Sequence, residues 1–172
     1  RSERIPLADQ ILGHGFLSLS YSRHNHFEKS RRSADKAFEL FTSTGQVSHY
    51  ILEAHAALMS TTLALWQKEG KKSKMAKRAQ RLLWGFAEFA LMYPFAKARQ
   101  KLLAGYVHQI KGNTWRSARA WNKTILVSQS LKMPYEEALA HQALGLHHKS
   151  QENMKQAREI FTRLGANYDL GR

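Results

Sequence analysis

Apolar residues recur at steps of three and four along most of the chain, which is the spacing of one face of an α-helix. One such stripe contains Val47, Ile51, Ala54, Leu58, Thr61 and Leu65, and another contains Met75, Ala79, Leu82, Phe86, Ala90 and Tyr93. The sequence shows no clear alternating run of β-branched residues and no Asn-Gly turn, which are the signals of strands and hairpins. The pattern predicts an all-α protein.

Prolines and glycines divide this pattern into segments. Pro6, Pro94 and Pro134 each open a periodic stretch, and Gly45, Gly70, Gly112 and Gly165 each follow the end of one. Thr114 and Asn153 are candidate N-caps. The expected helices therefore span 6–23, 27–43, 46–69, 72–92, 94–111, 114–131, 134–149 and 153–164. Because the links between them are short, neighbouring helices must pack antiparallel, as about four hairpins.

The last two hairpins form an internal repeat. Segments 94–124 and 134–164 match at a constant offset, which pairs Pro94 with Pro134, Gly105 with Gly145, His108 with His148, and Trp121 with Phe161. The second copy contains Leu144-Gly145, then His148, Ala157 and Phe161, and this spacing resembles the tetratricopeptide repeat. We expect the small residues to let two helices approach closely, and Phe161 to fill the gap toward the next hairpin.

The first two hairpins match that pattern only through Ala37 and Phe41, so they are either degenerate repeats or a different kind of hairpin. We therefore predict one helical-repeat domain over 1–172, with two divergent hairpins in 1–92 and two tetratricopeptide-like hairpins in 93–172, stacked as a right-handed superhelix. The predicted core includes Ala37, Phe41, Leu58, Leu82, Phe86, Leu103, Trp121, Leu144, Ala157 and Phe161.

The second half of the chain also resembles a particular kind of repeat region. The resemblance rests on Trp121-Asn122-Lys123, on 131–138 (Leu-Lys-Met-Pro-Tyr-Glu-Glu-Ala), on Ala143-Leu144-Gly145 and on 161–166 (Phe-Thr-Arg-Leu-Gly-Ala). Over roughly residues 85–172 the sequence is similar to the C-terminal helical-repeat region of large signalling ATPases, including nucleotide cyclases like the soluble (type 10) adenylyl cyclases.

This resemblance implies a regulatory or partner-binding segment whose catalytic domains lie elsewhere in the polypeptide. The chain has no Gly-x-x-x-x-Gly-Lys-Ser/Thr phosphate loop and no obvious paired-aspartate metal site, so no catalytic or cofactor-binding residue carries over to it. It begins at Arg1 without a methionine or a signal peptide, and we expect it to be a piece of a larger protein or a processed product.

The net positive charge of the chain indicates which kinds of partner it would attract. The chain carries 27 Lys and Arg against 13 Asp and Glu, a formal net charge of +14, which attracts acidic protein surfaces, nucleic acid or anionic lipid. It contains no cysteine, which fits a cytoplasmic location, and no apolar run long enough to span a membrane.

The densest basic segment is the candidate surface for an anionic partner. It comprises Lys68, Lys71, Lys72, Lys74, Lys77, Arg78 and Arg81, and it leads into Leu82, Leu83, Trp84 and Phe86. A basic amphipathic helix with an aromatic anchor is typical of calmodulin targets, membrane-surface helices and nuclear import signals. The alternative is that Met75, Ala79, Leu82 and Phe86 face the core while the lysines face water, and the smooth continuation of the stripe favours it.

Two other functions are open at this stage. A second basic cluster, Arg23, Lys29, Arg31 and Arg32, could join the first in a phosphate-contacting stripe, as in a basic nucleic-acid-binding helical module. A small helical enzyme would need a convergent site, but Asp9, Asp35 and Asp169 are far apart in sequence and no Gly-x-Ser-x-Gly motif occurs.

The nine histidines do not predict a metal site. His147 and His148 are adjacent and point in different directions on a helix, while His141 and His148 lie two turns apart. His24 and His26 have no cysteine and few carboxylates to complete a shell. We expect His108 and His148 to pack at the aromatic position of the repeat. The leading hypothesis is a non-catalytic docking segment that binds a protein with an acidic surface.

Overall fold

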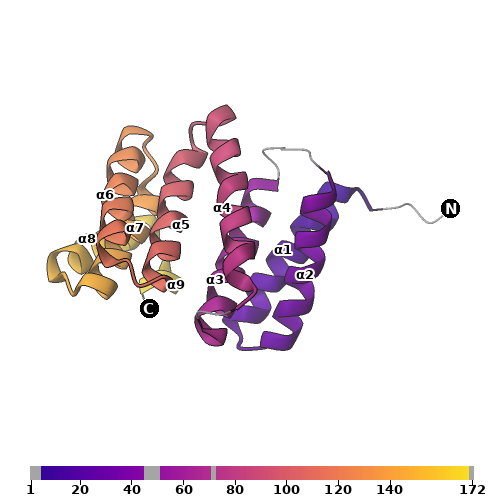
Figure 1. Cartoon of the computed structure of the whole chain (residues 1–172). Helices are drawn as coiled ribbons and strands as arrows, with labels where there is room; N and C mark the ends of the chain where they lie inside the picture. The colour runs from indigo at the N-terminus through magenta and orange to yellow at the C-terminus, as the bar shows by residue number, and fades with distance from the viewer. Residues whose placement is uncertain (1–4, 45–50, 71–72, 171–172) are drawn as a thin grey trace. The chain divides into compact units, whose positions relative to one another are not determined.

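The computed structural model describes residues 5–44, 51–70 and 73–170, and the elements in these residues are helices, as predicted (Figure 1). They are α1 (Leu7–Arg23), α2 (Phe27–Thr44), α3 (Leu52–Glu69), α4 (Met75–Met92), α5 (Ala96–Ile110), α6 (Thr114–Ser130), α7 (Pro134–His148), α8 (Gln151–Leu164) and α9 (Asn167–Leu170). None of the described helices combines the length and the apolarity needed to cross a bilayer. The all-α hairpin architecture is confirmed.

The chain divides into two compact units, unit 1 (Arg1–Tyr93) and unit 2 (Pro94–Arg172). This boundary lies one residue from the division that the sequence predicts between divergent and tetratricopeptide-like hairpins. That the two units form one right-handed superhelix stays a prediction.

The helix ends follow the local chemistry of the sequence. Gly70 and Gly165 end α3 and α8 with φ angles of 82° and 66°, a backbone conformation that costs glycine little. Pro134 occupies the first turn of α7, and Glu136 and Glu137 follow it at the positive end of the helix dipole. Gly45 lies outside the described residues.

Several predicted boundaries are wrong by a few residues. α5 begins at Ala96, because Pro94 and Phe95 form a turn before it. Asn113 rather than Thr114 caps α6, since its side-chain oxygen accepts a hydrogen bond from the Arg116 N–H at 3.1 Å.

Two further differences from the prediction lie in unit 2. Ser150 rather than Asn153 caps α8, accepting from the Asn153 N–H at 3.4 Å. The short helix α9 was not predicted. The expected starts of the third and fourth helices at 46 and 72 fall outside the described residues.

Unit 1 is built around α3, which packs mainly on α1 and then on α4 and α2. α1 and α3 approach closely at Gly15, where a β-carbon would lie 2.9 Å from the carbonyl oxygen of Ala54. Beside this point the hydroxyls of Ser18 and Thr61 are 3.1 Å apart, and the Ser30 hydroxyl donates to the Ser18 carbonyl at 2.8 Å. Small and polar residues therefore join the first three helices.

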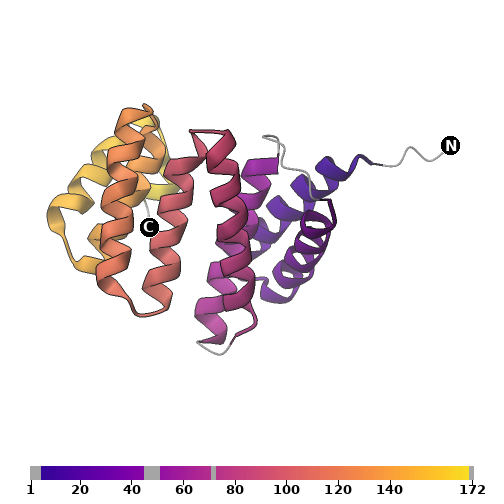
Figure 2. The same cartoon turned by 45° about the horizontal axis from the view of Figure 1, so that its top comes forward.

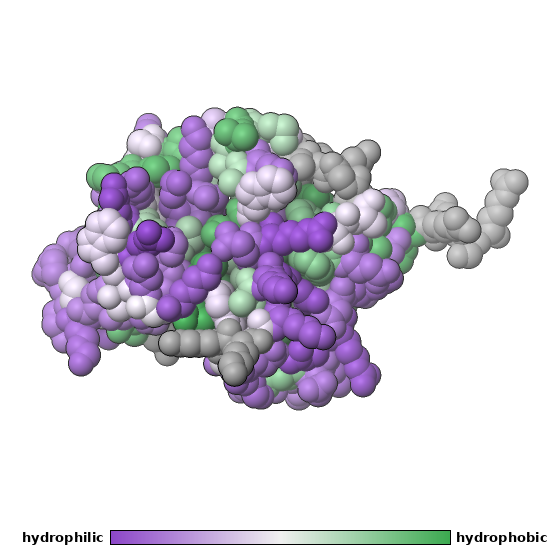
Figure 3. Space-filling view, viewed as in Figure 1, coloured by the Kyte–Doolittle hydropathy of each residue, from purple (hydrophilic) through white to green (hydrophobic). Residues whose placement is uncertain are grey.

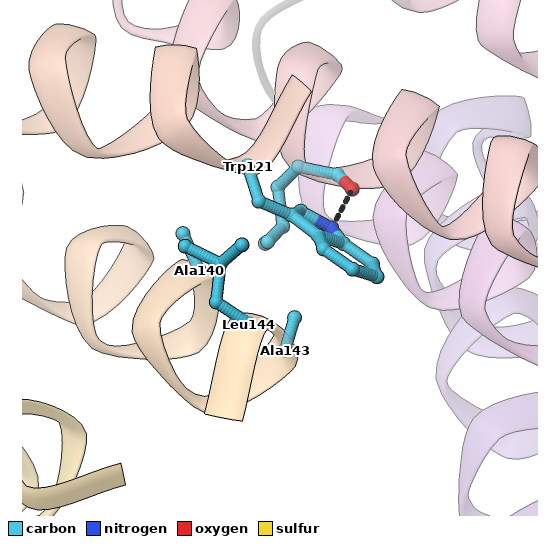
Figure 4. Packing of buried hydrophobic residues seen from close by; sticks show 5 residues of the cluster. Trp121, Ala140, Ala143 and Leu144 are labelled. Carbon is cyan, nitrogen blue, oxygen red and sulfur yellow. Dashed lines mark hydrogen bonds between the residues drawn. The ribbon is translucent and has the colours of Figure 1, made fainter. Parts of the chain in front are cut away.

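Unit 2 stacks α5, α6, α7 and α8, each against the next (Figures 1 and 2). The side chain of Trp121 extends from α6 to fill the space beside α7, where it packs on Ala140, Ala143 and Leu144 (Figure 4). Its indole N–H donates to the Leu102 carbonyl of α5 at 3.2 Å. Trp121 thus has the role predicted for the large residue of the repeat, which is to join its hairpin to the next one.

Phe161 has a comparable place at the other side of α7. It packs with Ala138, Ala157 and Ile160, and Ala166 and Leu170 cover it from the α9 end. The Tyr135 hydroxyl donates to the buried carboxylate of Asp169 at 3.0 Å, which holds α9 in place. Full burial of a phenylalanine side chain stabilises a fold by about 1.5–3 kcal/mol relative to exposure.

The predicted core is nearly complete. Of the ten residues named from the sequence, only Phe41 is not buried. Its ring is half-buried and lies 4.3 Å from the His55 ring, centroid to centroid.

Candidate functional site

Three of the seven basic residues that the sequence singled out lie on α4, and the buried and exposed faces of this helix separate as the core interpretation predicts. Met75, Ala79, Leu82 and Phe86 are buried, whereas Lys74, Lys77 and Arg81 are exposed. Lys71 and Lys72 lie outside the described residues. The apolar stripe therefore serves the core, and the exposed cations are available to a partner.

Trp84 belongs to the exposed side of α4. Its side chain is 68% exposed, and it follows Lys77 and Arg81 at helical steps of four and three, so these three residues share one face. We call Lys77, Arg81 and Trp84 the α4 face. Glu88 and Leu91 continue the same stripe and are also exposed.

The Arg81 guanidinium lies 5.8 Å from the Phe38 ring centroid and remains exposed. Other members of the predicted surface have closer structural partners. Arg78 donates to Asp35 on α2, with 2.5 Å between Nη2 and Oδ1, and its guanidinium lies 4.7 Å from the Phe38 ring centroid. The Lys68 ammonium lies 3.5 Å from the ring centroid of Phe27. These two cations join α2 to the helices beside it and are less suited to bind a partner.

Two cations of the second basic cluster also have structural partners. Arg31 forms an ion pair with Glu69 at the end of α3, and the Lys29 ammonium lies 5.8 Å from the Tyr21 ring centroid. Burial raises the pKa of Glu69, but hydrogen bonds from Ser73 and Arg31, with the charges of Arg31 and Arg78, hold that pKa below its ordinary value. The carboxylate therefore stays ionised and offsets part of the positive field.

The most unusual titratable group in unit 1 is His55, which is 1% exposed on α3. The rings of Phe41 and Phe86 lie 4.3 and 4.2 Å from its own, centroid to centroid, and neither ring nitrogen has a hydrogen-bond partner of ordinary geometry. Burial lowers the pKa of His55 to about 3, and the backbone of Leu82 opposes this only in part. The imidazole is a neutral core residue shielded from solvent.

Two histidines of unit 2, His147 and His148, pack against Trp121. It is His147, rather than His148, that stacks on the indole, at 5.3 Å between centroids and 17° between planes. His148 approaches the same ring edge-on at 5.9 Å, and its Nε2 lies 3.5 Å from the Ser117 hydroxyl. Burial, and then the neighbouring His148, lower the pKa of His147.

Within the part of the chain that the structure describes, no three side chains of the His, Cys, Asp and Glu types come together as a metal shell would require. A shallow surface depression of about 460 Å³ lies where α6, α7 and α8 meet. Its one carboxylate, that of Glu137, accepts a hydrogen bond from the Gln129 amide at 2.8 Å.

A second basic face was missed from the sequence. α6 exposes Trp115, with the Arg119 guanidinium 5.3 Å from its ring centroid, and also exposes Arg116 and Lys123. The signal that could have found it is the absence of any Asp or Glu in residues 89–135. Figure 3 shows hydrophilic side chains over much of the face that it displays, with smaller hydrophobic areas between them.

Comparisons with known protein families, with curated proteins and with solved structures found no match to this chain.

Proposed function

We propose that this chain is a non-catalytic docking segment that binds a protein with an acidic surface, through the α4 face. The single observation that carries the proposal is the exposure of Trp84 beside Lys77 and Arg81 on one side of a helix whose other side is buried. Exposed tryptophan and arginine are the residue types that most often dominate the binding energy of protein interfaces. The net charge of +14 would steer an acidic partner toward the chain.

Helix stability does not account for the placement of these cations. The first turn of α4 has no acidic residue, and Lys74 and Lys77 lie at that end. The amino terminus of a helix carries a partial positive charge, so each cation there costs about 0.3–1 kcal/mol at a surface. A binding role explains why basic residues occupy a position that the helix itself disfavours.

In the fuller form of the proposal, the segment belongs to a large signalling ATPase or an adenylyl or guanylyl cyclase-like protein, in the cytoplasm, and regulates it. The resemblance of residues 85–172 to such repeat regions supports this. The mass of the native polypeptide, detected with an antibody to this chain, tests it. A mass far above 19.8 kDa together with ATPase or cyclase domain peptides is expected, and a mass near that value contradicts it.

The docking role is tested by affinity capture from nuclease-treated extract of the source cells, followed by mass spectrometry. The variant Arg81→Glu/Trp84→Ala is expected to lose a protein that the wild type retains. Lys155→Glu, an exposed site on α8, is the matched control for the reversal of charge and is expected to retain it. Equal capture by all three proteins contradicts the proposal. So does a partner that is captured only from extract without nuclease treatment.

A further inference from the structure

Apart from Trp121, the fully buried positions of α6 are small and polar, while large apolar and basic side chains are exposed on its other side. Its buried positions are Ser117, Trp121, Thr124 and Ser128, so three of the four are small and polar. The residue two positions before each of these is exposed, and these exposed residues are Trp115, Arg119, Asn122 and Leu126. A shift of two residues is about 200° around a helix, so this second set lies on the opposite side. We call these four exposed residues the α6 face.

The two ends of the α6 face are large and apolar. Trp115 is 65% exposed and Leu126 is 66% exposed. They are eleven residues apart, which corresponds to about 17 Å along the helix. The core of unit 2 uses Trp121 on the opposite side of α6, so it does not require Trp115 or Leu126, and both remain exposed.

The charged side chains between and beside Trp115 and Leu126 on α6 are all positive. Arg116, Arg119 and Lys123 are exposed, and residues 89–135 contain no Asp or Glu. Burial lowers the pKa of His108, and the positive charges of Lys111 and Arg116 lower it further. The first turn of α6 also lacks an acidic residue, so the cation at Arg116 opposes the helix dipole as the α4 cations do.

We infer that the α6 face binds an acidic amphipathic helix of another protein. Such a helix would place two apolar residues about three turns apart against Trp115 and Leu126, and carboxylates between them against Arg119 and the flanking cations. A single-stranded nucleic acid could stack on Trp115 and contact the cations, but it would leave Leu126 without a role. The apolar residue at the far end of the stripe therefore favours the acidic helix.

This inference rests on the proposed docking function and names a second surface for it, in unit 2. Docking at the α4 face does not require the α6 face, because the residues concerned lie on different helices in different units. Docking at the α4 face and helix binding at the α6 face can therefore be disproved separately. Variants on α4 and on α6 distinguish them.

The test is a selection from a displayed library of helical peptides of about 18 residues, or five turns, with the full chain as the target. The peptides enriched by the selection are expected to carry a net negative charge and two apolar residues ten or eleven positions apart. Their dissociation constants are then measured by fluorescence anisotropy. Trp115→Ala and Leu126→Ala are each expected to weaken binding roughly tenfold. Leu146→Ala, at an exposed apolar site on α7 outside both faces, is the control and is expected to leave binding unchanged.

Several outcomes would overturn the inference. Enrichment of neutral or basic peptides would overturn it. So would acidic peptides whose affinity does not change with Leu126→Ala. Peptides that lose binding only with Trp84→Ala would support docking at α4 and remove the α6 site. A uridine oligonucleotide of about 20 nucleotides that binds more tightly than every peptide, and depends on Trp115, would replace the helix with nucleic acid. Circular dichroism of each variant checks that these exposed substitutions leave the fold intact.

Discussion

Gly105 of α5 leaves room for the indole of Trp121, because a β-carbon at Gly105 would overlap the indole nitrogen and its neighbouring ring atoms. The same indole nitrogen donates to the Leu102 carbonyl one turn earlier on α5. The tryptophan is fully buried and also packs against α7. One glycine therefore determines how closely α5 and α6 approach, and how α6 meets α7.

Gly105→Ala is expected to destabilise unit 2 by about 1–3 kcal/mol, because the added methyl group overpacks against a ring that is itself held by α7. The measurement is urea denaturation followed by tryptophan fluorescence. Gly13→Ala is the control, since nothing lies within 4 Å of a β-carbon there and the position is within α1. That control should be neutral or stabilising by about 0.5–1 kcal/mol. Equal effects of the two substitutions would contradict the close approach at Gly105.

Gly145 faces Met154 in the equivalent position of the second repeat, and a β-carbon there would overlap the methionine side chain. Methionine is flexible, so Gly145→Ala should cost less than Gly105→Ala. The larger Gly145→Leu is expected to cost about 1–3 kcal/mol, because the Met154 backbone nitrogen would also lie close.

A double variant identifies the cause of the Gly145 effect. If the loss comes from overlap with Met154, Met154→Ala should recover part of the stability lost in Gly145→Leu. The coupling free energy, measured by the same urea denaturation in a double-mutant cycle, is then expected to be about 0.5 kcal/mol or more in the direction of rescue. Additive losses would place the strain elsewhere in the hairpin.

The helices were predictable because periodicity and end signals agreed along the chain. The steps of three and four in Met75, Ala79, Leu82 and Phe86 correspond directly to buried positions on α4. The exact caps were not predictable in the same way. Asn113 and Thr114 are both good cap residues, and only the backbone conformation decides which side chain accepts the hydrogen bond.

The candidate surface was only partly predictable. A run of cations in sequence does not reveal which of them will reach a carboxylate on another helix, as Arg78 reaches Asp35. The exposure of Trp84 follows from its phase relative to Leu82 and Phe86 and could have been derived. The α6 face was harder to find, because burial of Ser117 and Thr124 contradicts the usual assignment of apolar residues to the core.

Arg99 and Glu136 connect α5 to α7 through a partly buried ion pair, in which the Arg99 Nε also donates to Oε1 at 3.1 Å. The side chains are 19% and 8% exposed. Glu136→Gln leaves the guanidinium without its counter-charge, and we expect it to destabilise unit 2 by about 1–3 kcal/mol, less than for a fully buried pair because Arg99 reaches solvent.

The matched control for this pair removes both charges. Arg99→Met/Glu136→Leu should cost less than Glu136→Gln alone, because no buried charge is left unpaired. Urea denaturation in low and high salt provides the measurement. A double variant that is clearly less stable than the single one would mean that the ion pair itself stabilises the contact between α5 and α7.

His55 predicts how the stability of unit 1 depends on pH. The unfolded chain binds a proton at this imidazole near its ordinary pKa of 6.5, whereas the folded chain binds one only near 3. Between these values the unfolded state holds more protons, so the stability is fully present above pH 6.5 and falls as the pH is lowered toward 3. The slope from this group is about 1.4 kcal/mol per pH unit.

The variant His55→Leu separates this contribution from that of the other titratable groups. It keeps an apolar side chain of similar size among Phe41, Phe86 and Phe89 and removes the proton-binding site. The free energy of unfolding is measured with urea at pH 7, 6, 5 and 4 for both proteins. The variant is expected to lose less stability per pH unit than the wild type below pH 6, because it has no imidazole to protonate on unfolding. Parallel pH profiles would mean that the imidazole takes up its proton without leaving the folded core.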